Sequence, residues 1–282
     1  MPKPAARIDD FHICPVPSHV GGPVTQPGDP TVLIGNATAA RYSDMALCTG
    51  TAAPDAVSMG SPTVVIGKLL AGRMGESTEH GGTVLMGFPT VLIGEPPPSV
   101  TVVRRGKILI VTNRDAHTIM MVGVQEFSGN GASEAYVKGA TDCINTTWSG
   151  RTEFEGSPYQ VECMITGRVA GDPKNPLANQ IRVIDTSVPP GINASRDPSH
   201  QPMYGKGVGY QHNTDQDDGW LTAAHEFGHS MGLKDEYVEL PPIDGERQNK
   251  HTGPPGGLMG YPTKSRPTPD NFGSLITGKG LA

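Results

Sequence analysis

The sequence predicts two regions of different architecture, a small all-β region followed by a larger α+β region. Two observations predict this division. A hexapeptide occurs three times in the first hundred residues, and glycine plus proline make up 26 of those residues, against 38 of the remaining 182. A proline run at residues 96–98 marks the change, and such a run is typical of a stiff, extended linker. We therefore expect domains at residues 1–95 and 102–282, joined by a linker at 96–101.

The repeated hexapeptide predicts three equivalent short strands. The sequence Pro-Thr-Val-Leu-Ile-Gly at residues 30–35 returns at 89–94, and residues 62–67 differ from it only by valine for leucine. β-Branched residues bounded by proline and glycine are typical of strands between turns. A repeat spacing of roughly 30 residues indicates pseudo-symmetric units. We expect the three strands to lie around a pseudo-threefold axis.

The same repeats carry side chains that can bind a metal. Three arginines, one in each repeat, are each followed seven positions later by a residue that can bind a metal: Arg7 by Cys14, Arg41 by Cys48 and Arg73 by His80. Two further histidines, His12 and His19, flank Cys14. A pseudo-threefold axis would bring such side chains together. A small glycine-rich domain has little core, and a tetrahedral set of histidine and cysteine ligands suits structural zinc.

These features resemble the PAAR-repeat proteins. The resemblance is carried by Ala5-Ala6-Arg7, Ala39-Ala40-Arg41, the Gly-Gly pairs and the placement of histidine and cysteine over residues 1–95. It implies a β-cone at the tip of the type VI secretion spike, with zinc near its vertex bound by three histidines and one cysteine. Carried over to this sequence, the implied ligands are His12, His19, Cys48 and His80. Cys14 competes with His12, because Cys14 occupies the repeat-equivalent position.

The second region has a mixed pattern of strands and helices. Apolar runs predict strands at residues 106–111, 159–165 and 180–184, and an apolar stripe predicts a helix at 133–148. Residues 207–210 are expected to form an edge strand that could pair with an extended peptide. Together these elements predict an α+β domain.

A second metal motif lies on a predicted helix. His225 and His229 flank Glu226 in the pattern His-Glu-x-x-His, and residues four apart share one face of a helix. Two imidazoles so placed can bind one zinc ion, with Glu226 beside the open coordination position. Gly232 can end the helix in a left-handed conformation and turn the chain back. This turn would bring Asp235 to the metal as a third ligand.

The extended pattern, H-E-x-x-H-x-x-G-x-x-D, resembles the metzincin metallopeptidases, in the form where aspartate replaces the usual third histidine. Residues 257–261 resemble their Met-turn, with Met259 beneath the metal. The resemblance implies a zincin-like fold and zinc-dependent peptide-bond hydrolysis with Glu226 as the general base. It also implies that Tyr261, two residues after the methionine, stabilises the tetrahedral intermediate.

Together, the two resemblances predict a type VI effector: a spike-tip cone, with one structural zinc, fused to a toxin domain with one catalytic zinc. Its expected partners are a VgrG-like spike trimer, a peptide or protein substrate in the target cell and a cognate immunity protein. Two other functions stay open. The second region could be a non-catalytic binding domain on a structural tip, or a zinc-dependent hydrolase of peptidoglycan peptides.

Charge and hydropathy exclude other classes of protein. The net charge is −6 with no long cluster of lysine and arginine, so nucleic acid is not an expected partner. No apolar run approaches the roughly 20 residues that span a bilayer. The charged, proline-bearing residues 1–10 do not predict a signal peptide, so export by the type VI machine is expected, to the target's periplasm or cytoplasm. Cys143 and Cys163 could form a disulfide or remain reduced.

Overall fold

The hexapeptide repeats form three equivalent antiparallel strand pairs in the computed structural model, which describes residues 2–184, 208–212, 221–243, 246–251, 257–259 and 266–281. Two are hairpins, β4 (Asp29–Ile34) with β5 (Ala37–Ala39) and β8 (Ser61–Ile66) with β9 (Leu69–Ala71), and the third pairs β11 (Phe88–Ile93) with the N-terminal strand β1 (Lys3–Ala5). The first two turn through consecutive left-handed residues, Gly35-Asn36 and Gly67-Lys68. Such turns match the twist of antiparallel strands.

A ring of backbone hydrogen bonds joins the three repeats. The amide of Ala6 donates to the carbonyl of Gly72 (2.9 Å), Gly72 donates to Ala40 (2.8 Å), and Ala40 donates to Ala6 (3.0 Å). Small residues are needed here, since a Cβ on Gly72 would lie 2.9 Å from the carbonyl oxygen of Ala40. The three repeats are therefore related by a pseudo-threefold axis.

Each repeat closes on an ion pair between an arginine and the acidic residue three positions later, and the pairs are Arg7–Asp10, Arg41–Asp44 and Arg73–Glu76. The flanks of this cone are made by two further β-units. One is the hairpin of β6 (Met45–Cys48) and β7 (Ala53–Ala56). The other is the small sheet of β10 (Thr83–Val84), β2 (Phe11–Ile13) and β3 (Gly22–Pro23).

The second region is built on one sheet. Its strand order is β12 (Val100–Arg105), β13 (Ile108–Asn113), β14 (Thr118–Ser128), β16 (Ser157–Val169) and β15 (Gly150–Phe154). Strand β17 (Ala178–Ile184) pairs in parallel with β14, and β18 (Val208–His212) pairs in parallel with β17. The predicted strands at 106–111, 159–165, 180–184 and 207–210 thus correspond to β13, β16, β17 and β18.

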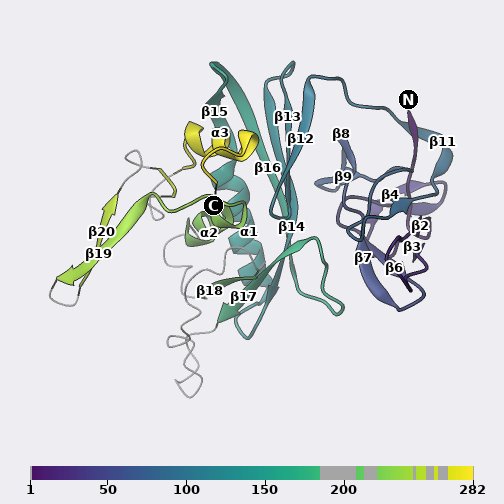
Figure 1. Ribbon diagram of the computed structural model, residues 1–282, viewed down its shortest axis with the longest axis horizontal. Helices are drawn as coiled ribbons and strands as arrows, with labels where there is room; N and C mark the ends of the chain where they lie inside the picture. The colour runs from purple at the N-terminus through teal and green to yellow at the C-terminus, as the bar shows by residue number, and fades with distance from the viewer. Residues whose placement is uncertain are drawn as a thin grey trace.

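Helices cover one face of this sheet, as Figure 1 shows. Helix α1 (Glu134–Trp148) begins at its N-cap Ser133, as the apolar stripe predicted, and packs against β16 and against α2 (Leu221–Ser230). Helix α3 (Pro269–Thr277) and the hairpin of β19 (Tyr237–Ile243) and β20 (Glu246–His251) complete the region. Among the described helices, none is both long enough and apolar enough to cross a membrane.

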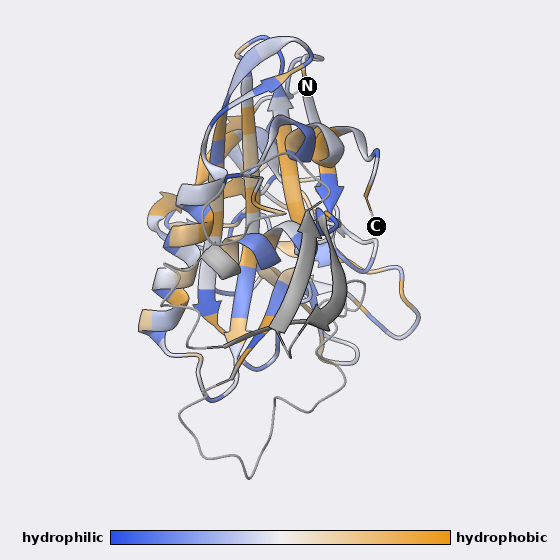
Figure 2. Ribbon diagram, turned by 90° about the vertical axis from the view of Figure 1, so that its left-hand side faces the viewer, coloured by the Kyte–Doolittle hydropathy of each residue, from blue (hydrophilic) through white to orange (hydrophobic). Residues whose placement is uncertain are grey.

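The cone packs on the opposite face of the sheet. Strand β13 is buried on both sides: Ile108 and Ile110 belong to the core beneath the helices, while Leu109 and Val111 belong to a second core. That second core includes Leu70 of the cone together with Tyr42, Ala56 and Leu69. Figure 1 shows the cone and the helices on opposite sides of the sheet. Figure 2 shows that the central strands of the sheet are strongly hydrophobic. The two regions therefore share a core.

Hydrogen bonds cross this junction as well. The hydroxyl of Tyr42 donates to the carbonyl of Lys107 (2.8 Å), and the side-chain amide of Asn175 donates to the hydroxyl of Ser43 (3.0 Å). The proline run at 96–98 leads directly into β12, which starts at Val100. The cone is therefore attached to the sheet by packing as well as by the linker.

Candidate metal sites

Helix α2 brings together the side chains of the second metal motif. The Nε2 atoms of His225 and His229, one helical turn apart, lie 3.1 Å from each other. The helix ends at Ser230, and the chain turns back at Gly232, whose φ of 92° is in the left-handed region. This turn places Oδ1 of Asp235 at 3.2 Å from Nε2 of His225 and 3.1 Å from Nε2 of His229. The three side chains that the sequence suggested as ligands thus converge on one point.

The hydrogen bonds of the two imidazoles fix where their lone pairs point. Nδ1 of His225 lies 2.9 Å from the carbonyl oxygen of Leu258, and Nδ1 of His229 lies 2.7 Å from that of Leu233. A carbonyl only accepts, so each Nδ1 carries the hydrogen and a neutral imidazole directs the lone pair of Nε2 toward Asp235. Three electron-pair donors at such separations repel each other unless a cation lies among them. Nitrogen and oxygen ligands around tetrahedral zinc are about 3.3 Å apart, so this donor set fits zinc.

The electrostatics of this site favour the charge states that a metal needs. Burial alone would raise the pKa of Asp235, but hydrogen bonds and charge from His225 and His229 hold that pKa well below its usual range. The carboxylate is therefore ionised at neutral pH. It is 35% exposed, while the two histidine side chains are 4–5% exposed, and a hollow of about 200 Å³ adjoins it. Three protein ligands on a zinc ion would leave a fourth coordination position open, an arrangement typical of catalytic zinc.

A buried methionine packs against α2. Met259 is fully buried, and a Cβ added at Gly228 would lie 2.6 Å from its sulfur atom and 3.1 Å from the ring of Trp148. Only glycine at position 228 therefore allows the helix to lie so close to the methionine. The adjacent Leu258 supplies the carbonyl that orients His225. Glu226, between the two histidines, is half-buried, and Tyr261 lies outside the described residues.

The vertex of the cone carries another group of ligands, the vertex cluster, which consists of Cys14, His19, Cys48 and His80. The sulfur of Cys14 lies 3.7 Å from Nδ1 of both histidines, the sulfur of Cys48 lies 3.6 Å from Nδ1 of His80, and the two Nδ1 atoms are 3.3 Å apart. In tetrahedral zinc sites these separations are about 3.6 Å for sulfur and nitrogen and about 3.3 Å for two nitrogens. The vertex cluster therefore fits a Cys₂His₂ zinc site.

The thiol of Cys48 needs a cation to ionise at neutral pH. Burial, together with the neighbouring Cys14 and Asp55, raises the pKa of this thiol to about 12. Zinc ligation deprotonates a thiol, because the thiolate is the metal ligand. All four cysteines of the chain are unpaired, Cys143 and Cys163 included.

His12 lies next to the vertex cluster rather than among its four members. Its Nε2 atom lies 3.6 Å from the sulfur of Cys48 and 3.4 Å from Oδ2 of Asp55. Cys14, the alternative suggested by the repeat spacing, is the residue that joins His19, Cys48 and His80 within 4.8 Å. The role of His12 as a ligand stays a prediction.

Asp55 is a functional candidate that the sequence did not single out. It is fully buried in β7. Although burial opposes it, the neighbouring His12 and Thr78 and the backbone amides of Ala56 and His80 hold the pKa of Asp55 at about 2. An aspartate within a short strand next to Pro54 was its only signal in the sequence. That signal does not distinguish a buried carboxylate from a turn residue.

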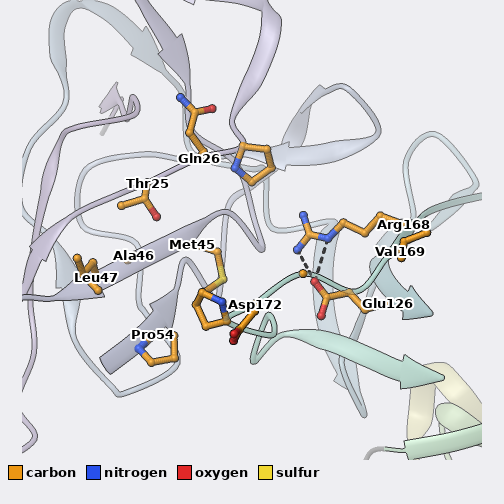
Figure 3. Close-up of a pocket in the computed structure, with 13 residues that line it drawn as sticks. Thr25, Gln26, Met45, Ala46, Leu47, Pro54, Glu126, Arg168, Val169 and Asp172 are labelled. Atoms are coloured by element: carbon orange, nitrogen blue, oxygen red, sulfur yellow. Dashed lines mark hydrogen bonds and ion pairs between the residues drawn. The ribbon is translucent and has the colours of Figure 1, made fainter. Parts of the chain in front are cut away.

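A pocket of about 530 Å³ lies where the cone meets the sheet, as Figure 3 shows. The cone contributes Met45, Leu47 and Pro54 to its walls, and the sheet region contributes Arg168 and Glu126. The guanidinium of Arg168 donates to Glu126 (3.0 Å). Neither the α2 histidines nor any member of the vertex cluster lines this pocket. Glu126, one of the two acidic residues that line it, is engaged in structural hydrogen bonds, and we assign the pocket no catalytic role.

The fold and the vertex cluster define a β-cone with a metal-capable tip. A family model described as the PAAR motif matches residues 16–86, from β3 to just beyond β10. The match supports a PAAR-repeat spike-tip protein of the type VI secretion system, and PAAR motifs bind zinc. It includes His19, Cys48 and His80, and it ends before the α+β region begins. Comparison with curated proteins gave no match.

Proposed function

We propose that this chain is a type VI spike-tip effector whose α+β region is a zinc-dependent peptide-bond hydrolase. The observation that carries the proposal is the convergence of His225, His229 and Asp235. Their donor atoms lie 3.1–3.2 Å apart, and backbone carbonyls aim both imidazole lone pairs at the same point. The resemblance of H-E-x-x-H-x-x-G-x-x-D and of the Met259 turn to the metzincins supports this reading.

The protein groups would divide the work of hydrolysis as follows. Zinc, when bound, supplies a Lewis acid that polarises the peptide carbonyl and acidifies water. Glu226 accepts a proton from the attacking water, whose oxygen bonds to the carbonyl carbon of the substrate. Glu226 then donates that proton to the amine nitrogen as the C–N bond breaks. Leu258 and Leu233 hold the imidazoles in the tautomer that this chemistry needs.

The open side of the site suits a catalytic rather than a structural role. Three protein ligands leave room for water or substrate, whereas structural zinc sites are closed by four. The carboxylate of Asp235 is 35% exposed, and the hollow beside it gives solvent access to this ligand. The substrate would be a peptide or protein of the target cell.

The cone supplies the route of delivery in this proposal. A PAAR-repeat cone sits at the tip of the type VI spike, so the expected docking partner is a VgrG-like trimer, and an immunity protein would protect the producing cell. Because the sheet and the cone share a core, the hydrolase would travel as one body with the tip. The target compartment would be the periplasm or the cytoplasm of the neighbouring cell.

The direct test is hydrolysis of fluorescein-labelled casein, and in parallel of purified peptidoglycan, by the full chain loaded with zinc. Glu226→Gln should lower the rate by about 10²- to 10⁴-fold, the usual contribution of a general base, while the zinc content stays unchanged. Glu134→Gln, an exposed change at the start of α1, is the matched control and should retain the parent rate. Equal rates for the parent and Glu226→Gln would contradict the proposed mechanism.

A further inference from the structure

A second group of metal-capable side chains lies against the vertex cluster. His12, Cys48 and Asp55 each offer one ligand atom, these atoms lie within 4.8 Å of one another, and all three residues are buried. We call them the inner group. Cys48 belongs to both the vertex cluster and the inner group, so its sulfur lies between two sets of donors.

The tautomer of His12 directs its Nε2 atom into the inner group. Nδ1 of His12 lies 2.8 Å from the carbonyl oxygen of Gly22, which can only accept, so Nδ1 carries the hydrogen. In the neutral imidazole, the lone pair of Nε2 then faces the sulfur of Cys48 and Oδ2 of Asp55. A lone pair aimed at a carboxylate and a sulfur is repulsive. A metal ion, a proton on Nε2 or the thiol hydrogen of Cys48 must lie between them.

The distance from Nε2 of His12 to Oδ2 of Asp55 favours a metal ion over a proton on Nε2. A hydrogen bond from a charged imidazole to a carboxylate is about 2.7–2.9 Å long. The observed separation of Nε2 from Oδ2 is 3.4 Å, and the separation of Nε2 from the sulfur of Cys48 is 3.6 Å. Around tetrahedral zinc, nitrogen and oxygen ligands are about 3.3 Å apart, and nitrogen and sulfur ligands about 3.6 Å. Both values fit two ligands of one metal ion.

Asp55 provides an independent sign of a bound cation. Its Oδ1 accepts hydrogen bonds from the amides of Ala56 (2.8 Å) and His80 (3.1 Å), whereas its buried Oδ2 has no hydrogen-bond partner. The residue is fully buried. A buried carboxylate oxygen without a partner is costly, and such groups are normally paired or bound to a metal. Oδ2 lies 3.4 Å from Nε2 of His12 and 3.7 Å from Nδ1 of His80, at the border between the inner group and the vertex cluster.

We propose that the inner group binds a second divalent cation in the cone, next to the metal of the vertex cluster, with the thiolate of Cys48 shared by both ions. One imidazole, one thiolate and one carboxylate form a donor set that suits Zn²⁺. The tip of the cone is then a two-metal centre. Asp55 and His12 are ligands of the inner ion, and Cys14, His19 and His80 are ligands of the outer one.

Metal counting on the full chain tests the proposal. Asp55→Asn keeps Oδ1 for the amides of Ala56 and His80 but removes the anionic ligand, so zinc measured by mass spectrometry should fall by one ion per chain. Asp44→Asn is the matched control, because Asp44 is an equally buried carboxylate of the cone that bonds to Arg41. It should leave the zinc content unchanged. This difference does not depend on whether the α2 site holds zinc.

Cadmium NMR on the parent chain tests the shared sulfur without any substitution. With ¹¹³Cd in place of zinc, two resonances from the cone should show scalar coupling to each other, because a single sulfur joins the two ions. Cys48→Ser should remove both cone ions together. The proposal is overturned if Asp55→Asn retains the parent's zinc content, or if the cone gives a single cadmium resonance without coupling.

Discussion

The two candidate metal sites of this chain differ in how they are built. The vertex cluster collects its ligands from all three repeats of the cone, and it has four of them, including two thiols. The site on α2 takes two histidines from one helix and an aspartate from the turn that follows, and it has three. Four ligands from distant segments would complete the coordination of a zinc ion and cross-link those segments of the fold. Three ligands from one local segment leave a position open for chemistry.

The difference has a consequence for what each metal would stabilise. Removing metal from the vertex cluster releases segments as far apart in sequence as Cys14 and His80, whereas removing metal from α2 leaves the helix held by its core contacts. Phe227 and Met231 on the buried side of α2 are 1–2% exposed, and Ala224 accepts a hydrogen bond from the indole of Trp148 (2.8 Å). We therefore expect a metal in the vertex cluster to raise the stability of the fold, and a metal on α2 to act mainly on the rate of hydrolysis.

The largest effect is expected from removing the carboxylate of Asp235 from the α2 site. Asp235→Ala should lower casein hydrolysis by at least about a hundredfold, since even outer partners of metal ligands contribute 10- to 100-fold. The neighbouring Lys234→Ala should keep the parent rate, as Lys234 is exposed. Thermal unfolding of both variants should stay close to that of the parent. A large fall in stability for Asp235→Ala would mean that the α2 metal is structural.

The next effect concerns the core shared by the cone and the sheet. Leu70→Ala should lower the free energy of unfolding by about 2–5 kcal/mol, because Leu70 is fully buried in that core. Tryptophan fluorescence is the readout, since both tryptophans lie beyond residue 100. Leu33→Ala, at a site 63% exposed, should change stability by less than about 0.5 kcal/mol. A cone that unfolds without changing the fluorescence would contradict the shared core.

A smaller effect is expected where α2 packs on Met259. Gly228→Ala should destabilise the chain by about 1–3 kcal/mol, because the new methyl group would overlap Met259. Met259→Ala in the same chain should recover part of that loss. Gly273→Ala in α3 is the control, since a Cβ there meets nothing within 4 Å, and it should stabilise the helix by up to about 1 kcal/mol. Equal effects at both glycines would rule out close packing of α2 on the methionine.

The smallest effect is expected for a single hydrogen bond between the two regions. Tyr42→Phe removes the donor to the carbonyl of Lys107 and keeps the ring in the shared core. The free energy of unfolding, measured in urea, should fall by about 0.5–1.5 kcal/mol. No change would indicate that water replaces the hydroxyl at this position.

The elements that the sequence predicted are those whose signal is local. The hexapeptides became β4, β8 and β11 because β-branched residues between turn residues have few alternatives to a strand. The convergence of Asp235 on α2 follows from helix periodicity and from one glycine at position 232. Strand β14 was missed, because its Met120-Met121 pair, Gly123 and Gln125 break the alternation expected of a strand.

Features that depend on packing between distant segments could not be predicted. The continuous apolar run of β13 indicated burial on both faces, but nothing in it says that the cone covers one of them. The inner group shows the same limit, since Asp55 and His12 are 43 positions apart and belong to different repeats. The repeat spacing was more informative for the vertex cluster. It suggested Cys14, which occupies the position equivalent to Cys48 and His80 and which lies in the cluster with them.

The central claim is that the α+β region is a toxin that acts through Glu226, and growth of a susceptible bacterium tests it most directly. The full chain should be used, because the cone covers one face of the sheet. It should be expressed in the cytoplasm and, separately, directed to the periplasm. The parent should stop growth in one compartment, and Glu226→Gln, at equal expression and equal zinc content, should not. Equal toxicity of the parent and Glu226→Gln would contradict the claim.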